Sequence, residues 1–326
     1  MPRLPIISYL LALVVLLGGC AREARQTQLM TSTTRASPTA VGWCGTLALP
    51  SQWQDDTPVG GLSALGWDRD EALLYLISDR GWLHRVRLNF EAGFEEGTLS
   101  GLEPLKTYVL RDEDGNALDE DAADAESLVL KHADNGTRGD TTLLIGFERD
   151  HRLQRFYPNG LPIDEPLTPK GLRRARHNAG AEAMGRHTHE GIIVGLESAP
   201  DGSVEGTTRL FSLKTGTEWT YPLAKDAGSA LTALETYGDG LLAVERAFAP
   251  PAPLVISLRR VRLTDNARAE VQTLARLSSG EGWRLDNFEG LTRLDGNRYL
   301  MVSDDNFSLI QQTLLSCFEL PPPSDV

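Results

Sequence analysis

A short phrase recurs five times along the chain, and this repeat constrains the fold more than any other feature of the sequence. In each copy an acidic or small polar residue stands beside Gly, Ser or Ala and a Leu or Met, and an apolar run with a charged end follows. The copies are anchored, at intervals of 49 to 63 residues, on Ser63, Glu126, Glu182, Leu231 and Glu289. A period of roughly 50 residues is typical of a propeller, a solenoid or an array.

Each repeat has the pattern of a small antiparallel sheet. In the last copy we expect strands at Phe288–Leu294, Tyr299–Ser303 and Leu309–Cys317, with a hairpin turn at Asp295–Asn297. Short apolar runs bounded by Gly, Asp and Asn favour strands, and no segment has a helical period strong enough to indicate an α/β fold. About four strands per repeat make a propeller blade, so the sequence predicts an all-β propeller.

The two ends of the chain indicate how the ring closes. The last copy runs out of chain after three strands, whereas Trp43–Leu49 is a strand with no repeat of its own. We expect this N-terminal strand to supply the outer strand of the last blade. The repeat count predicts five blades, and six stays open because the long stretch Tyr157–Asn178 could contain another.

The three cysteines support the same closure. Cys20 lies in the leader region, which leaves Cys44 and Cys317 at opposite ends of the folded part. Two leftover thiols in an oxidising compartment favour a disulfide, and neighbouring strands in the closing blade would bring them together. A loop of this length would contribute roughly 4–5 kcal/mol on the chain-entropy model. Two buried free thiols are the alternative.

The N-terminus has the features of a targeting segment. Arg3 precedes an apolar run at Ile6–Leu17 that is short for a membrane span. Leu16–Cys20 resembles the lipobox of bacterial lipoproteins, in which the cysteine carries the acyl chains; an ordinary signal peptide is the alternative. We expect four parts: a signal peptide at 1–19, a lipidated flexible tether at 20–41, a propeller at 42–320 and a tail at 321–326.

Localisation and partners follow from the leader and the charge. Acylated Cys20 would hold the protein on a lipid bilayer, and Ala21 after it, by resemblance to Gram-negative lipoproteins, favours a periplasm-facing position on the outer membrane. The net charge of −13 argues against nucleic acid, which needs clustered Lys and Arg. We expect a monomer.

Several segments resemble the phytase-like family, which carries an esterase-like activity of phytase domain. The resemblance runs from about Gly60 to Leu320 and rests on Ser78–Gly81, Phe147–Arg152, Asn178–Met184, Leu241–Phe248, Asp286–Leu291 and Ser303–Thr313. It implies a secreted or envelope β-propeller and, more loosely, phosphoester hydrolysis. Fold is the firmer implication, because one fold hosts many functions.

The repeat itself places carboxylates at corresponding positions. In a propeller the first strand of each blade lines the central channel, and the repeated Glu126, Glu182 and Glu289 stand at its start. Blade one has Ser63 there, and blade four has Leu231, with Glu235 further along. A second set ends the neighbouring strands: Asp79, Glu148, Glu197, Glu245 and Asp304–Asp305. We expect carboxylates from several blades to converge on one mouth of the channel.

Oxygen-rich clusters suit Ca²⁺, so we assign possible ligands and phosphate contacts to this mouth. The expected metal ligands are Glu126, Glu182, Glu289, Asp304 and Asp305. The expected catalytic residues are Glu289, Glu182, Arg149 and Arg246. The expected substrate-binding residues are Arg80, Arg149 and Arg246, which would hold a phosphorylated small molecule. The alternative is structural: recurring Glu and Arg can be buried ion pairs that join neighbouring blades.

Other catalytic patterns are missing from the sequence. Gly61–Leu65 is not a GxSxG elbow, because its fifth residue is Leu and no helix follows. His187–Glu190 has two histidines but falls where a turn is expected. The sequence favours metal-assisted phosphoester hydrolysis. A non-catalytic propeller that binds an envelope partner or small ligand, and a metal-dependent lactonase-like hydrolase, remain as alternatives.

Overall fold

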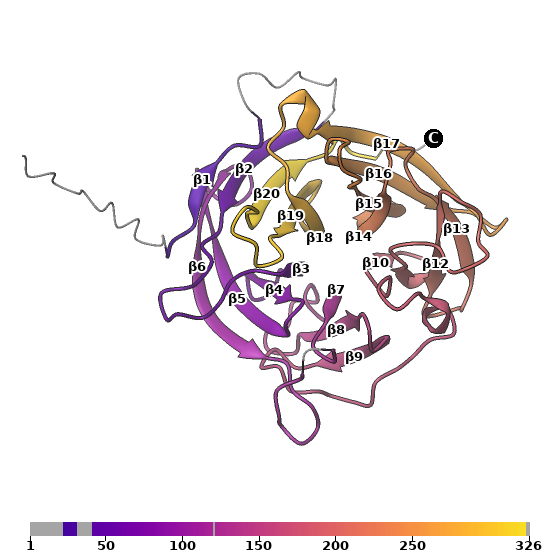
Figure 1. Cartoon of the computed structure of the whole chain (residues 1–326). Helices are drawn as coiled ribbons and strands as arrows, with labels where there is room; N and C mark the ends of the chain where they lie inside the picture. The colour runs from indigo at the N-terminus through magenta and orange to yellow at the C-terminus, as the bar shows by residue number, and fades with distance from the viewer. Residues whose placement is uncertain (1–21, 31–40, 120, 324–326) are drawn as a thin grey trace, which may run out of the picture.

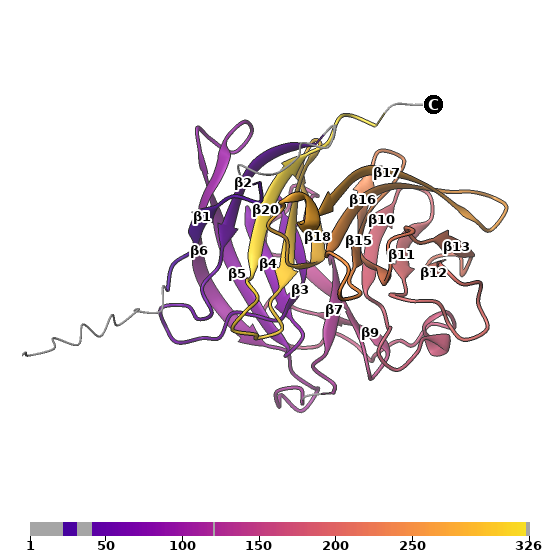
Figure 2. The same cartoon turned by 45° about the horizontal axis from the view of Figure 1, so that its top comes forward.

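The computed structural model describes residues 22–30, 41–119 and 121–323, and these form a five-bladed β-propeller. Five antiparallel sheets stand around a central axis (Figure 1). Figure 2 shows the ring obliquely, with the connecting loops at both ends of the strands. The predicted fold class and blade number are confirmed.

The first three blades follow one another along the chain. Blade 1 contains β3 (Leu62–Asp68), β4 (Leu73–Ser78), β5 (Trp82–Glu91) and β6 (Thr98–Val109). Blade 2 contains β7 (Ala125–Lys131), β8 (Thr142–Phe147) and β9 (Arg152–Phe156). Blade 3 contains β10 (Ala183–His187), β11 (Gly191–Gly195), β12 (Thr207–Ser212) and β13 (Glu218–Pro222), and a 3₁₀ helix, η1 (Leu172–Arg174), precedes it.

The last two blades complete the ring. Blade 4 contains β14 (Ser229–Tyr237), β15 (Gly240–Ala247), β16 (Val255–Leu263) and β17 (Ala269–Ser278). A 3₁₀ helix, η2 (Ser279–Glu281), leads to blade 5, whose strand order is β18 (Asn287–Asp295), β19 (Arg298–Asp304), β20 (Leu314–Glu319), β2 (Gly42–Ala48) and β1 (Arg25–Thr27). The first strand of each blade stands nearest the axis (Figure 1).

The closure joins the two ends of the chain in blade 5. Strand β2 pairs antiparallel with β20, as the sequence predicts. Cys44 and Cys317 form a disulfide across this pair, with 4.9 Å between their Cα atoms and 273 residues between them in sequence. The predicted pairing is confirmed, and the free-thiol alternative is wrong.

Part of the predicted tether belongs to the fold. Strand β1 pairs with β2, with Gln26 opposite Leu47. Leu29 is buried in the core between blades 4 and 5, and its carbonyl accepts a hydrogen bond of 2.8 Å from the Arg284 amide. The expectation of a flexible segment fails at residues 22–30, because β2 has a free edge that β1 can cover. The predicted signal peptide, Cys20 and the remaining tether lie outside the described residues.

Blade 2 has three strands in place of the expected four. Its place for a fourth strand is taken by irregular chain: Leu153 and Leu167 exchange two main-chain hydrogen bonds of 2.8 Å, and Phe156 bridges Pro162. This segment belongs to the stretch that left a sixth blade open. Within the described residues it forms no separate sheet, so the count stays at five.

One hydrophobic cluster lies at each of the five interfaces between blades. The second strands show why: every residue of β4 is buried, because both faces of the sheet contact neighbouring sheets. In the part of the chain described here, no helix is long and apolar enough to cross a membrane.

Candidate active site

In four of the five blades, a β-bulge in the inner strand turns one side chain into the channel. In blades 1, 2, 4 and 5 the pairing register shifts by one residue near the start of the inner strand. The bulged residues are Ser63, Glu126, Thr232 and Glu289. In blade 3 Glu182 directly precedes β10 and lines the same narrow hollow. We call this end the acidic mouth, defined by Glu126, Glu182 and Glu289.

Blade 4 requires a correction of one residue. The sequence places Leu231 at the channel position, but Leu231 is fully buried in the core between blades 3 and 4, and Thr232 lines the channel. A bulge inserts one extra residue into the inward–outward alternation of side chains along the strand. Because Leu231 and Leu234 are both apolar, the sequence pattern does not show where this extra residue lies.

The channel residues Ser63 and Thr232 form hydrogen bonds between the inner strands of neighbouring blades. Ser63 Oγ donates to the carbonyl of Ala125 in the next blade, and Thr232 Oγ1 donates to the carbonyl of Phe288 at 3.0 Å. Each accepting carbonyl directly precedes a bulged glutamate, Glu126 or Glu289. The two blades that lack a carboxylate therefore help to fix the carboxylate of the following blade.

Five apolar side chains form a collar below the acidic mouth. Each stands two residues after the channel residue of its blade: Leu65, Leu128, Met184, Leu234 and Leu291. None is more than 7% exposed. The hollow between them and the mouth measures only about 10 Å³, room for about one water. The collar therefore separates the two ends of the channel, and it explains the Leu or Met that ends each repeated phrase.

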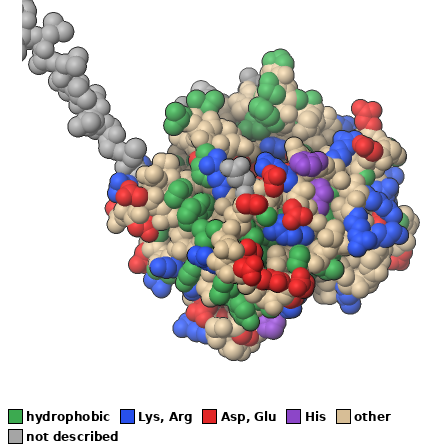
Figure 3. Space-filling view, turned by 60° about the horizontal axis from the view of Figure 1, so that its bottom comes forward, with side chains coloured by type: hydrophobic (Ala, Val, Ile, Leu, Met, Phe, Trp, Pro, Cys, Tyr) green, Lys and Arg blue, Asp and Glu red, His purple; other side chains and the backbone are tan. Residues whose placement is uncertain are grey.

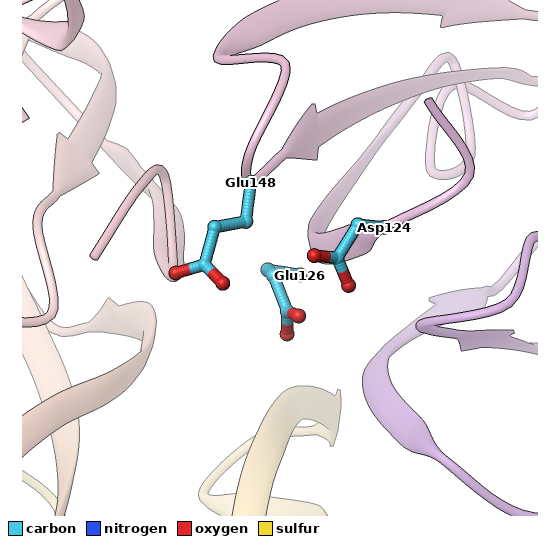
Figure 4. A group of neighbouring side chains, drawn as sticks. All are labelled: Asp124, Glu126 and Glu148. Carbon is cyan, nitrogen blue, oxygen red and sulfur yellow. The ribbon is translucent and has the colours of Figure 1, made fainter. Parts of the chain in front are cut away.

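Three carboxylates converge in blade 2, where the ligand atoms of Asp124, Glu126 and Glu148 all lie within 4.8 Å of one another (Figure 4). Asp124 precedes β7, Glu126 is the bulged residue and Glu148 follows β8. The Glu148 amide donates to the Asp124 carbonyl at 2.8 Å, which fixes the two loops. We call this group the blade 2 triad.

One carboxylate oxygen of Asp124 lacks a hydrogen bond, although an arginine lies beside it. The Asp124 side chain is buried, and its Oδ2 has no hydrogen-bond partner among the described residues. Arg149 Nε lies 3.0 Å from this oxygen as an ion pair without hydrogen-bond geometry. A buried carboxylate oxygen that lacks a hydrogen bond is costly, so the triad fits an additional positive ligand.

Crowding and burial shift the proton equilibria of the whole mouth. Burial, followed by neighbouring carboxylates, raises the pKa of Glu126 and Glu182 well above the usual value. Burial and the charge of Asp304 raise the pKa of Glu289 to about 8, and burial raises that of Asp304 to about 7. Like charges in one enclosed site cannot all ionise. At neutral pH the mouth must therefore retain protons or gain a cation.

The predicted arginines have different surroundings. Arg149 is half exposed beside the triad and also faces Asp121 at 3.6 Å. Arg246 lies across the channel and contacts Glu197 at 3.0 Å and Glu289 at 3.4 Å. Arg80 is exposed at the rim, where its guanidinium stacks on the Phe307 ring at 3.7 Å.

The other predicted metal ligands lie outside the triad. Only Glu126 belongs to it; Glu182, Glu289, Asp304 and Asp305 do not. Asp305 Oδ1 accepts the amides of Gly61 and Phe307, both at 3.0 Å, so it joins blade 5 to blade 1. Figure 3, tilted to bring the edge with blade 2 forward, shows acidic side chains near the centre of the visible surface.

The side chain of Glu245 lies in the core and is not part of the acidic mouth. It is fully buried and binds Tyr221, Ser229 and Arg259, which connects blade 3 to blade 4. Glu245 therefore has a structural role, although its ion pair with Arg259 lies within blade 4 and the hydrogen bond from Tyr221 is the contact that crosses to blade 3.

Sequence reasoning missed Asp124 and Glu148 as a metal pair for Glu126. A signal was present: blade 2 has an acidic residue two positions before its bulged glutamate, where blade 3 has Gly180 and blade 5 has Asn287. The second carboxylate set did include Glu148. The sequence alone could not show that the loop after β8 brings Glu148 toward Glu126.

The repeat, the ring and the acidic mouth agree with a comparison against protein families. A model described as phytase-like, esterase-like activity of phytase, matches residues 57–307. The chain belongs to this family. The match covers all five inner strands and ends just after Asp305, so it contains every residue of the acidic mouth. No curated protein matched this phytase-like chain at a significant level. The family suggests hydrolase activity.

Proposed function

We propose that this phytase-like protein hydrolyses phosphoesters at the acidic mouth with the help of a divalent cation. The observation that carries the proposal is the blade 2 triad, in which three carboxylates converge and the buried Asp124 Oδ2 lacks a hydrogen bond. Family membership supports the hydrolase class.

The donor set fits calcium. Carboxylate oxygens are hard ligands, and Ca²⁺ binds them at about 2.3–2.6 Å, so two ligands of one ion lie up to about 5 Å apart. The 4.8 Å spread of the triad is within that limit. A cation would also replace the protons that the raised pKa values of the mouth imply. Calcium is therefore the ion that we propose.

The surrounding side chains would act on the substrate. A bound cation would polarise a phosphoryl oxygen and activate water. Arg149, beside the triad, would donate to phosphate oxygens, and so would Arg246, whose buried Nε has no partner among the described residues. Arg80 would contact the substrate at the rim. Glu289, with its pKa raised to about 8, would hold a proton for the leaving group, and Glu182 would orient water.

The test uses soluble protein without its N-terminal 21 residues against a panel of phosphomonoesters and phosphodiesters in Ca²⁺. We expect hydrolysis that a chelator abolishes and that Glu126→Gln and Glu148→Gln reduce about 100-fold or more, as loss of charge stabilisation at a reacting centre does. Glu205→Gln, on an exposed loop, is the matched control. Inertness toward the whole panel, or activity that survives chelation, would contradict the proposal.

A non-catalytic role is the second candidate. Arg246 contacts Glu197 of blade 3 and Glu289 of blade 5, so this network also joins three blades. If the mouth only binds a ligand or envelope partner, the wild type will show no turnover of the panel. Glu289→Gln will then change only the melting temperature. Lactones in the same panel test the third candidate, a lactonase-like activity.

We also propose that acylated Cys20 anchors the protein at the periplasmic side of the outer membrane. The lipobox-like leader supports this proposal. Full-length protein should fractionate with outer membranes, and Cys20→Ala should lose the acyl mass. Recovery of the unmodified chain in the soluble periplasm would contradict it.

A further inference from the structure

The channel has a second mouth beyond the apolar collar, and it is hollowed. A cavity of about 760 Å³ opens there, within the range of small-molecule sites. Its walls come from the inner strands of all five blades, beyond their bulges. We call it the arginine mouth, defined by Arg69, Arg186 and Arg293.

The floor of this cavity is apolar. The collar residues Leu65, Leu128 and Met184 also line the arginine mouth, and Leu294 adds to them. Trp67 forms part of one wall, stacked on Phe94 at 5.4 Å between ring centroids. The Trp67 indole N–H is buried and has no hydrogen-bond partner among the described residues. This wall therefore offers an apolar surface.

Two of the three arginines lack a carboxylate partner. Arg186 donates to the carbonyl of Leu130, and Arg293 donates to the carbonyl of Gly296 at 2.6 Å. Among the described residues, neither forms an ion pair within 4.0 Å. Arg69 differs, because it pairs with Asp295 at 2.8 Å and Asp134 at 3.7 Å. A guanidinium has five donors, so Arg186 and Arg293 retain most of theirs.

Glu235 stands on β14 between these arginines. Its two oxygens accept the amides of Thr236 at 2.6 Å and Arg293 at 3.2 Å. Burial raises its pKa above the usual value, while its charge still acts on both Arg186 and Arg293. Among the described residues, neither guanidinium forms an ion pair with it within 4.0 Å, so both keep donors for a further acceptor.

We propose that the arginine mouth binds a small organic anion, with its carboxylate or phosphate head on Arg186 and Arg293 and its apolar body on the collar. Arginine pairs planar oxyanions through two parallel N–H donors, and the two side chains approach from blades 3 and 5 across blade 4. The apolar floor favours an anion with a hydrocarbon body over an inorganic one. This site is distinct from the acidic mouth, because the collar lies between them.

The experiment measures binding by titration calorimetry with five probes: inorganic phosphate, phenyl phosphate, acetate, benzoate and hexanoate. We expect benzoate and hexanoate to bind more tightly than acetate, and phenyl phosphate more tightly than phosphate. Comparing benzoate with phenyl phosphate decides between the two head groups. The double variant Arg186→Gln/Arg293→Gln should weaken the best probe about ten-fold or more, as loss of a charged hydrogen bond does.

Three controls keep the outcome specific. Arg87→Gln, a half-exposed arginine on the outer part of blade 1, should bind like the wild type. Arg186→Lys/Arg293→Lys should retain part of the affinity, which covers a glutamine variant that does not fold. Glu126→Gln and chelation should leave binding unchanged even where they abolish hydrolysis. Absence of saturable binding, or equal affinity in the double glutamine variant when folded, would overturn the proposal.

Discussion

The two mouths of the channel are built from the same five strands and carry opposite chemistry. At the start of the inner strands, bulges turn Glu126 and Glu289 inward beside Glu182. Further along the same strands, Arg186 and Arg293 face a cavity of about 760 Å³. Position along a strand, and not the choice of strand, therefore decides which charge the channel presents.

The two mouths also differ in how their charges are compensated. The acidic mouth crowds like charges until several carboxylates must hold protons, whereas the arginines are separated by blade 4 and bonded to main-chain carbonyls. Guanidinium groups cannot release their charge in this way. The acidic mouth can thus exchange protons for a cation, whereas the guanidinium groups of the arginine mouth stay positively charged.

The largest expected effect is on the closure that both mouths share. Cys44→Ser/Cys317→Ser removes the covalent link in blade 5, which contributes to both ends of the channel, and leaves the pairing of β2 with β20. On the chain-entropy model the free energy of unfolding should fall by about 5 kcal/mol. Urea unfolding measures it, and dithiothreitol should destabilise the wild type but not the variant. Equal midpoints for oxidised and reduced wild type would show that closure does not depend on the bond.

The next effect breaks the separation between the mouths. Leu234→Ala removes a collar side chain that is 2% exposed, and loss of a buried leucine costs about 2–5 kcal/mol. Denaturant unfolding checks this value. Leu105→Ala, on the exposed part of β6, is the matched control and should change stability by less than about 0.5 kcal/mol. Similar losses for both variants would mean that the collar is not a packed layer.

Calcium should act on one mouth alone. At a hundred times its dissociation constant a bound ligand stabilises the folded state by about 2.7 kcal/mol. Thermal melting with Ca²⁺ and with chelator should show this shift for the wild type and for Glu235→Gln at the arginine mouth. Glu126→Gln should lose it. A shift that depends on Glu235 and not on Glu126 would reverse the assignment.

The last effect is measured as a slope of stability with pH in the chelated protein. The pKa values of Glu289 and Asp304 rise from 4.5 to about 8 and from 3.8 to about 7 on folding. Between about pH 5 and 8 the folded state retains protons that the unfolded chain releases, so stability should fall as pH rises. The limit is about 1.4 kcal/mol per pH unit for each group.

Urea midpoints across pH 5.5–8.5 measure this slope. Glu289→Gln should flatten it, and Ca²⁺ should oppose it by stabilising the ionised mouth. Glu205→Gln, on an exposed loop, should leave it unchanged. Stability that rises steadily with pH over this interval would show that the mouth ionises without penalty.

Much of the fold was accessible from the sequence because its signals are local. Alternating apolar runs and Gly or Asp turns predicted the strands, and the unpaired strand at Trp43–Leu49 predicted the closure with Cys44 and Cys317. The prediction is wrong where a segment pairs with a partner that is distant in the sequence. Strand β1 formed within a segment read as a tether, because the edge of β2 was free to pair with it.

The candidate site was accessible only in part. The repeated Glu126, Glu182 and Glu289 do meet in the channel. Leu231 was the wrong residue by one position, because a bulge breaks the alternation on which the prediction relied. Asp124 and Glu148 lie in loops. Because loops have no periodic sequence pattern, the sequence does not predict where their side chains point.

The sequence by itself predicted a propeller with a count of five blades, the strand that closes it and the cysteine pair, since these depend on repeat length and residue order. The structure then excluded a sixth blade among the described residues and showed the disulfide. The tertiary structure alone decided which carboxylates converge. It also decided that Leu65, Leu128, Met184, Leu234 and Leu291 form one collar and that arginines face a second cavity. The physical reason is that a one-residue bulge and the angle between blades set where each side chain points, and neither is encoded in a local pattern.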